Sequence, residues 1–156
     1  MATDISRDLV VGLQSITSTT MNESITQTES LLPSPILTFI DSTLPYIYLP
    51  LEACRRFENA LGLSWNKTAE MYWVNDTLHQ ALLNSNLSFI FTIADHKAGG
   101  STVQIILPYA SFDLEVKYPF EPGTIRYFPL QQAVDESQYT LGRSFLQEAW
   151  VLFDLS

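Results

Sequence analysis

Two short apolar segments near the start of the chain predict β-strands. Along residues 8–16, Leu9, Val11 and Leu13 alternate with other residues, so their apolar side chains share one face of an extended strand. Residues 36–40 are apolar at four of five positions, and we expect this strand to be buried on both faces. Asp41 follows directly, so a carboxylate stands at the end of an apolar strand.

Residues 17–34 separate these two strands and have a different composition. They are rich in Ser, Thr, Asn, Gln and Glu, and proline-containing turn sequence follows them. We expect this segment to be a mobile loop or an insertion. The chain as a whole, residues 1–156, has a length that suits one domain.

A helix is predicted between Pro50 and Gly62. Proline is favoured at the first helical position, and glycine is favoured just past the last. Apolar residues between them recur at three- and four-residue steps and form one face: Leu51, Cys54, Phe57 and Leu61. On this face Cys54 is interpreted as a small core residue and not as a reactive thiol.

The remaining chain is dominated by β-branched and aromatic runs that polar and glycine-containing turns separate. These runs are residues 71–74, 88–93, 103–107, 112–116 and 126–130. Residues 96–100 are typical of a hairpin connection. A second short helix is expected over residues 143–149, and a last strand over residues 150–153. The pattern therefore predicts a mainly β fold with two short helices.

Composition and charge exclude several classes of function. The chain is 46% hydrophobic and 16% charged, and its net charge is −9. An acidic chain of this kind is unsuited to binding nucleic acid or an anionic membrane surface. No apolar run approaches the ~20 residues of a membrane span, and we read no signal peptide at the start. Cys54 is the single cysteine, so an internal disulfide is excluded.

Most catalytic motifs are absent from the sequence. It has no Gly-x-Ser-x-Gly motif, no phosphate-binding glycine loop and no His/Cys/Asp cluster with zinc spacing, so we expect no metal and no cofactor. His79 and His96 lie in polar surroundings and are interpreted as surface residues. Asp41 is the better candidate, because a carboxylate that ends a buried strand must be hydrogen-bonded or have a raised pKa. The alternative is a turn or capping aspartate.

A second segment supports the functional interpretation of Asp41. Residues 138–154 contain an apolar run that ends at Gly142, a short helix and then a strand. Glycine at this position allows another backbone to pass closely, because it has no Cβ. Together with residues 39–50, this segment resembles the C-terminal lobe of pepsin-like (family A1) aspartic proteases, with the closest similarity to secreted fungal members. The resemblance extends from Leu9 to Asp154 and preserves the order and spacing of the segments.

The resemblance implies an aspartic endopeptidase lobe and a second lobe as its partner. Pepsin-like enzymes have two similar lobes, and each gives one catalytic aspartate to a pair that shares a proton. By resemblance Asp41 is the catalytic residue of this lobe, and Ser42 supplies a hydroxyl that locks the active-site loops together. The partner is the N-terminal protease lobe, or a second copy of the chain, and the substrate is a peptide. The chain by itself is expected to be inactive.

The active-site segment departs from the family pattern. Thr43 stands where the family has glycine, and a β-branched residue resists the backbone conformations that glycine permits. Leu44 replaces a hydroxyl residue, and Pro45 has no N–H. Arg143 follows Gly142 where aspartate is common; close to Asp41, its charge would lower the pKa of that carboxylate. A similar pair, Asp76-Thr77, lacks the preceding buried strand and is interpreted as part of a turn.

The sequence contains four possible N-glycosylation sites, at Asn22, Asn66, Asn75 and Asn86. They suit an extracellular or secretory-pathway location for the parent protein. A consistent interpretation is that the chain is a fragment or truncated product of a secreted two-lobed protein.

Three hypotheses for function follow. The first is the endopeptidase lobe centred on Asp41. The second is a non-catalytic pepsin-like lobe that serves as a peptide-binding or structural module, which the changes at Thr43 and Leu44 favour. The third is an unrelated secreted β protein. The family assignment requires that Asp41 and Gly142 lie close together at one edge of a barrel-like sheet.

Overall fold

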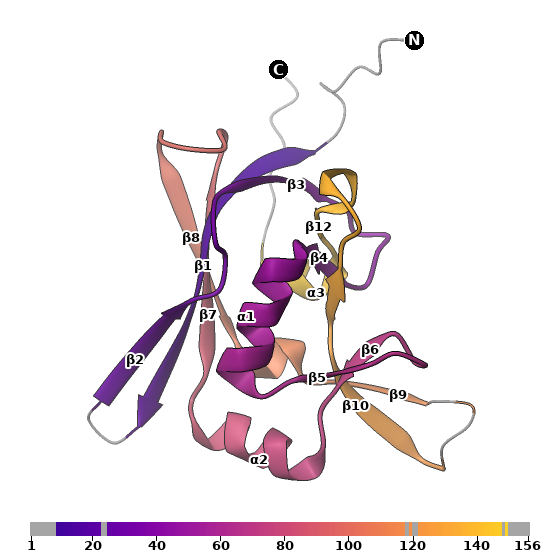
Figure 1. The fold of residues 1–156 in the computed structure, drawn as a ribbon. Helices are drawn as coiled ribbons and strands as arrows, with labels where there is room; N and C mark the ends of the chain where they lie inside the picture. Colours follow the sequence, from indigo (N-terminus) through magenta and orange to yellow (C-terminus); the bar gives the residue numbers. More distant parts are fainter. Residues whose placement is uncertain (1–8, 23–24, 118, 120–121, 148, 150–156) are drawn as a thin grey trace.

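A computed structural model of the chain describes residues 9–22, 25–117, 119, 122–147 and 149. Their strands form two sheets, and the mainly β class that the sequence predicts is confirmed (Figure 1). The predicted strand over residues 150–153 lies outside the described residues.

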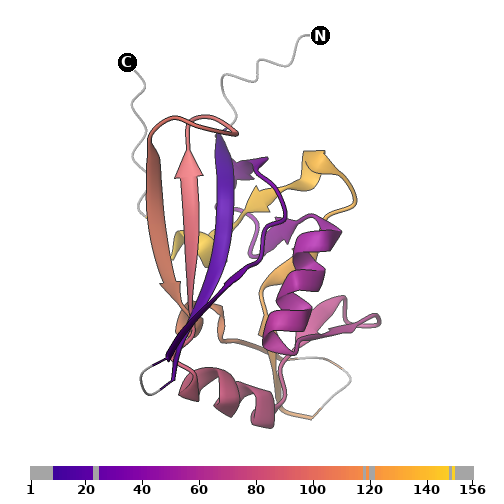
Figure 2. The same cartoon turned by 60° about the vertical axis from the view of Figure 1, so that its left-hand side comes forward.

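The larger sheet has eight strands in the order β11–β4–β12–β3–β1–β7–β8, with β2 paired to β1. Its strands are β1 (Val10–Asn22), β2 (Ile25–Ser30), β3 (Ile36–Ile40), β4 (Ile47–Leu49), β7 (Ser88–Ala94), β8 (Thr102–Pro108), β11 (Leu130–Gln132) and β12 (Thr140–Leu141). Figure 2 shows β1, β7 and β8 side by side, with α1 facing them. The β7–β8 hairpin, with its connection at residues 96–100, is as the sequence predicts.

The smaller sheet has four strands in the order β5–β6–β10–β9. These are β5 (Ser64–Asn66), β6 (Met71–Trp73), β9 (Leu114–Lys117) and β10 (Thr124–Phe128). The helices are α1 (Leu51–Leu61), α2 (Asp76–Asn84) and α3 (Arg143–Leu146), and the 3₁₀ helices η2 (Tyr109–Phe112) and η3 (Glu136–Gln138) precede β9 and β12.

The prediction of a loop over residues 17–34 is wrong for most of that segment. Residues 17–22 continue β1, and residues 25–30 form β2, which pairs with β1 from Thr17↔Ser30 to Asn22↔Ile25. The polar composition misled the interpretation because β2 is exposed, and an exposed strand has no need of apolar alternation. The expected mobility of the segment stays a prediction.

The bounds of β3 agree with the sequence prediction, but its burial does not. Ile36 and Thr38 are buried, whereas Leu37 between them is 49% exposed. The strand therefore has one covered face and one partly open face, and the apolar residues of the open face form a surface next to Asp41.

Helix α1 begins and ends where the sequence signals predict. Pro50 precedes the first helical residue as the N-cap, and Gly62 ends the helix in the left-handed region at φ 74°. The buried face includes Cys54 and Phe57. The Phe57 ring packs on Phe89 of β7 and Phe128 of β10, with ring centroids 5.7 and 5.8 Å apart. The helix thus joins the two sheets through an aromatic core.

Helix α2 was not predicted, and the interpretation of Asp76-Thr77 as a turn is wrong. Asn75 caps this helix, since its side-chain oxygen accepts a hydrogen bond from the Leu78 amide at 2.8 Å. His79 lies on the covered face of the helix and is only 7% exposed, so it is not a surface histidine. His96, in the β7–β8 hairpin, is exposed as expected.

Candidate functional site

The two segments that the family resemblance requires to meet lie side by side. Strand β12 runs parallel to β3, with Thr140 opposite Phe39 and Leu141 opposite Ile40. The ladder continues one step further, because the Asp41 amide donates to the Leu141 carbonyl at 3.2 Å. The end of β3 and the end of β12 therefore meet at one place, although they are distant in sequence.

Gly142 makes this meeting sterically possible. A Cβ at this position would lie 2.2 Å from the Tyr46 carbonyl oxygen and 2.5 Å from the Leu44 carbonyl oxygen. Beyond the glycine, the Arg143 amide donates to Leu44 O at 2.7 Å and the Ser144 amide to Pro45 O at 3.3 Å. The Ser144 hydroxyl also donates to Pro45 O. The chain after Asp41 is therefore held against the start of α3 by backbone contacts.

The Asp41 carboxylate is held by the turn that follows it. Its Oδ1 accepts the Thr43 amide at 2.8 Å and the Thr43 hydroxyl at 2.6 Å. These bonds, first from the hydroxyl and then from the amide, lower the pKa of Asp41 below its ordinary value, and desolvation opposes them weakly. Arg143 contributes nothing to this shift. Its charge instead lowers the pKa of Tyr127 against the larger, raising effect of burial.

Thr43 is accommodated by this turn without backbone strain. Glu70 and Asn86 are the only non-glycine residues with positive φ in the part of the chain that the structure describes. Thr43 consequently has an ordinary backbone conformation while its amide reaches the Asp41 carboxylate. The expected resistance of a β-branched residue to this geometry is not seen. The difference from glycine lies in the added hydroxyl donor.

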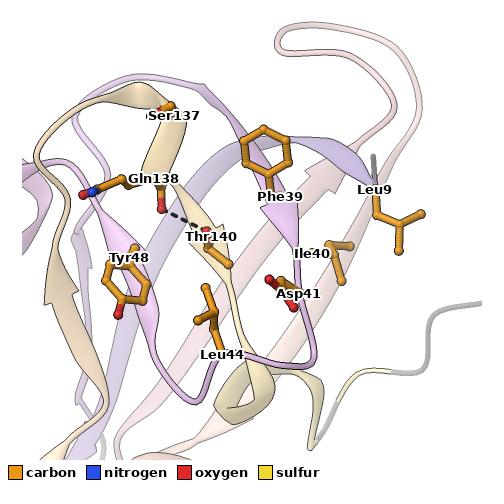
Figure 3. A pocket seen from close by; sticks show the side chains of 9 residues that line it. All are labelled: Leu9, Phe39, Ile40, Asp41, Leu44, Tyr48, Ser137, Gln138 and Thr140. Atoms are coloured by element: carbon orange, nitrogen blue, oxygen red, sulfur yellow. Dashed lines mark hydrogen bonds between the residues drawn. The ribbon is translucent and has the colours of Figure 1, made fainter. Parts of the chain in front are cut away.

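An open groove with a volume of about 670 Å³ lies beside Asp41 (Figure 3). Its walls are partly apolar and partly polar, and they come from the residue before β1, from β3 and the turn after it, from β4, and from the segment around β12. The lining residues are Leu9, Phe39, Ile40, Asp41, Leu44, Tyr48, Ser137, Gln138 and Thr140. By the family resemblance Leu44 stands where a hydroxyl residue is usual, and its apolar side chain lines the groove. Ser42 and Thr43 are exposed at the turn.

Most residues that line this groove are not indicated by any pattern in the sequence. Tyr48 and Thr140 carry no motif, and they reach the groove only because β4 and β12 are adjacent strands. Tyr48 also belongs to an aromatic group, since its ring and that of Tyr127 pack edgewise on Tyr46 with centroids 6.3 and 6.0 Å apart. In the segment after Asp41, successive residues alternate between the two faces of a strand. This alternation is the one signal in the sequence that could have indicated which residues face the groove.

The four possible glycosylation sites lie at the ends of secondary-structure elements. Asn75 is the exposed N-cap of α2, and Asn86 is exposed at φ 47° just before β7. Asn66 ends β5, where its side-chain oxygen accepts the amides of the following turn. Asn22 is the last residue of β1, and its side chain is outside the described part of the structure.

Other candidate chemistry is limited. Burial raises the pKa of the Cys54 thiol to about 12, so its interpretation as a core residue agrees with its environment. Among the described residues, no group of three or more His, Cys, Asp or Glu side chains could hold a metal ion. The described helices are also too short or too polar to cross a membrane.

The strand arrangement defines a single lobe of the pepsin-like aspartic proteinase fold. A solved structure with this arrangement is the aspartic proteinase from Irpex lacteus, which superposes with a TM-score of 0.52 at 14% sequence identity. The match covers 94% of this chain and 44% of that enzyme, so the chain spans less than half of its length. The sequence matches no protein-family model and no curated protein. The likeness is therefore one of fold.

Proposed function

We propose that this chain is one lobe of an aspartic endopeptidase and contributes Asp41 as one of two catalytic carboxylates. The observation that carries the proposal is the position of Asp41. It stands at the end of β3, beside an open groove with both apolar and polar walls, with one carboxylate oxygen fixed by the turn. A half-exposed carboxylate with a fixed orientation is suited to act on a water molecule.

The chemistry requires a second carboxylate opposite Asp41. The ionised member of such a pair takes a proton from water, and the resulting hydroxide adds to the peptide carbonyl carbon. The protonated member gives its proton to the carbonyl oxygen, which yields a tetrahedral intermediate. Transfer of a proton to the nitrogen then breaks the C–N bond. In this scheme the groove beside Asp41 holds an apolar side chain of the peptide, and no metal or other cofactor is needed.

The partner in this proposal is an N-terminal lobe that supplies the second aspartate. The chain matches 44% of the structurally similar aspartic proteinase from Irpex lacteus. This share supports a partner lobe of comparable size. In this proposal the Ser42 hydroxyl donates to the facing loop of that partner, which its exposure at the turn supports. A second copy of the chain is the alternative partner. By itself the chain is inactive.

The test is reconstitution with a partner lobe. The chain is fused to the N-terminal lobe of a pepsin-like enzyme, and cleavage of a denatured protein is measured at acid pH. We expect activity in the fusion, none in the chain alone, and loss of activity in Asp41→Asn with the fold retained. Thr43→Gly is expected to raise kcat more than it changes KM, because it removes the hydroxyl that keeps Asp41 ionised. Equal activity of the Asp41→Asn fusion would refute the proposal.

One observation favours a second candidate function, a non-catalytic module that binds peptides or supports another domain. The two hydrogen bonds from Thr43 lower the pKa of Asp41, which favours its ionised form and opposes the sharing of a proton. This candidate predicts that the fused protein binds peptides without cleaving them, and that Thr43→Gly does not restore cleavage.

We also propose a secretory location for the parent protein. Asn75 and Asn86 are exposed, which supports glycan attachment at these two positions. Expression through a eukaryotic secretory pathway should give a mass that falls after glycosidase treatment, with a smaller fall in Asn75→Gln. No mass change in either form would contradict this location.

A further inference from the structure

A second cavity adjoins the groove beside Asp41. Its volume is about 350 Å³, and it shares Phe39 and Ser137 with the first. Leu37 and Tyr139 contribute apolar surface to it. In Figure 3, Phe39 and Ser137 lie at the end of the groove that is remote from Leu44. The two cavities therefore lie next to each other along the open face of β3, and together they are called the trough.

The residues of β3 that line the two cavities follow the repeat of an extended strand: Leu37 lines the second cavity, Asp41 the first, and Phe39 both. Leu37, Phe39 and Asp41 alternate along the chain, and alternate residues of a strand lie about 6–7 Å apart on the same face. An extended peptide laid along the trough has the same repeat. Two side chains that are two residues apart in such a peptide can therefore enter the two cavities, one on each side of Phe39.

One wall of the second cavity comes from the β7–β8 hairpin connection, which carries Lys97. This connection is fixed against β1 at two points. A Cβ on Gly12 would lie only 1.9 Å from the His96 carbonyl oxygen, which shows how closely the two backbones approach. The Gln14 side-chain amide donates to His96 O at 3.2 Å and to Gly99 O at 2.8 Å. The Lys97 wall is thus anchored before any ligand binds.

The facing wall comes from η3 and carries Glu136. This short helix is capped by Asp135, whose Oδ1 accepts the Ser137 amide at 2.8 Å. Partial burial raises the pKa of the neighbouring Tyr139, and the negative charges of Glu136 and Asp135 raise it further. Among the described residues, neither Lys97 nor Glu136 takes part in an ion pair. The cavity is therefore lined by apolar residues together with one cation and one anion, and neither charge is in an ion pair within the described part of the chain.

We propose that the trough along β3 binds an extended peptide. One apolar side chain of this peptide lies beside Asp41. The side chain two residues away has an apolar body and an uncharged polar tip, as tyrosine does. Lys97 and Glu136 determine this second specificity. Either charge repels a like charge on the ligand, whereas the pair together offers both a donor and an acceptor to a hydroxyl or amide. The inference deepens the proposed function and rests on it for the direction of the peptide relative to Asp41.

The experiment measures binding and needs no catalysis. The ¹⁵N-labelled full chain is titrated with acetyl-Ala-Leu-Ala-Tyr-Ala-amide and with the reversed order, acetyl-Ala-Tyr-Ala-Leu-Ala-amide, and amide shifts are followed by NMR. One order is expected to shift the amides of Phe39, Lys97 and Ser137 together. Replacing its Tyr by Ala should weaken binding about tenfold, as expected from partial burial of an aromatic side chain. Replacing Tyr by Lys or Glu should weaken binding as well.

Charge exchange in the protein gives the sharper test. Lys97→Glu should make the Lys-containing peptide bind about threefold better than the Glu-containing one, and Glu136→Lys should reverse this order. Both residues are on exposed segments, so both variants are expected to fold, and their NMR spectra check this. Shifts confined to the groove beside Asp41, or an unchanged order of peptides in both variants, would overturn the inference.

The outcomes separate this inference from the proposed function. Binding with the expected preference, but no cleavage by the fused protein, would support the trough and reject the endopeptidase. Cleavage by the fusion without any effect of Lys97 or Glu136 would reject the trough alone. Concentration-dependent broadening of trough amides without added peptide would identify a second copy as the occupant and would also reject it.

Discussion

Gly142→Ala tests whether the close backbone crossing organises the candidate site. The glycine has φ −87° and ψ −164°, which alanine adopts readily, so any effect comes from space and not from backbone strain. The new methyl carbon would lie 2.2 Å from one backbone carbonyl oxygen and 2.5 Å from another. Backbone atoms cannot rotate away as a side chain can, so β12 and the chain after Asp41 must separate.

The expected cost of this separation can be estimated. Overpacking of a well-packed region costs about 1–3 kcal/mol. The hydrogen bonds of Arg143 N to Leu44 O and of Ser144 N to Pro45 O are lost or stretched, at about 1 kcal/mol each. The substitution should therefore lower the free energy of unfolding by about 3–5 kcal/mol, a large part of the ~5–15 kcal/mol that is usual for a domain.

Urea unfolding followed by circular dichroism measures this free energy. The matched control is Gly99→Ala, because Gly99 has φ 72° and open space around its missing Cβ. That variant should lose only about 1–2 kcal/mol, through backbone strain. The close backbone crossing does not require glycine if Gly142→Ala is no less stable than the control, or if it unfolds at the same urea concentration as the unchanged chain.

Three further measurements test individual contacts. Thr43→Val should raise the pKa of Asp41 toward its ordinary value, because it removes the hydroxyl donor and keeps the amide; ¹³C NMR titration measures this, and an unchanged pKa contradicts it. The lowered pKa stabilises the fold above about pH 3.8, and this contribution is lost as pH falls through the pKa of the folded form, so Thr43→Val should reduce it. The Cys54 thiol, with a pKa of about 12, should react with iodoacetamide at pH 8 far more slowly in the folded chain than in urea, and equal rates would count against its burial. Arg126→Met should lower the free energy of unfolding by about 1 kcal/mol, because Asp76, Glu115 and Asp113 lose a cation 2.8, 3.2 and 3.8 Å away; no change in urea unfolding would show that these pairs together are neutral to stability.

Local pattern alone was sufficient for several elements. The bounds of β3 and α1, and the hairpin connection between β7 and β8, follow from apolar periodicity, from Pro50 and Gly62, and from a glycine-containing turn. These signals act over a few residues, so they need no knowledge of neighbours. The same local reasoning failed at α2, where Asp76-Thr77 in the first turn of the helix is interpreted as part of a turn, and at β2, where an exposed strand has the composition of a loop.

The site depended on contacts between distant segments. The sequence by itself determined that Asp41 ends an apolar strand and that Gly142 ends another, and the family resemblance indicated that the two should meet. Only the tertiary structure decided that β12 inserts between β3 and β4, that Thr43 can serve the carboxylate without strain, and that Lys97 and Glu136 border a cavity next to the groove. The physical reason is that such contacts arise from strand pairing across the whole chain, and no periodicity within one segment encodes its partner in space.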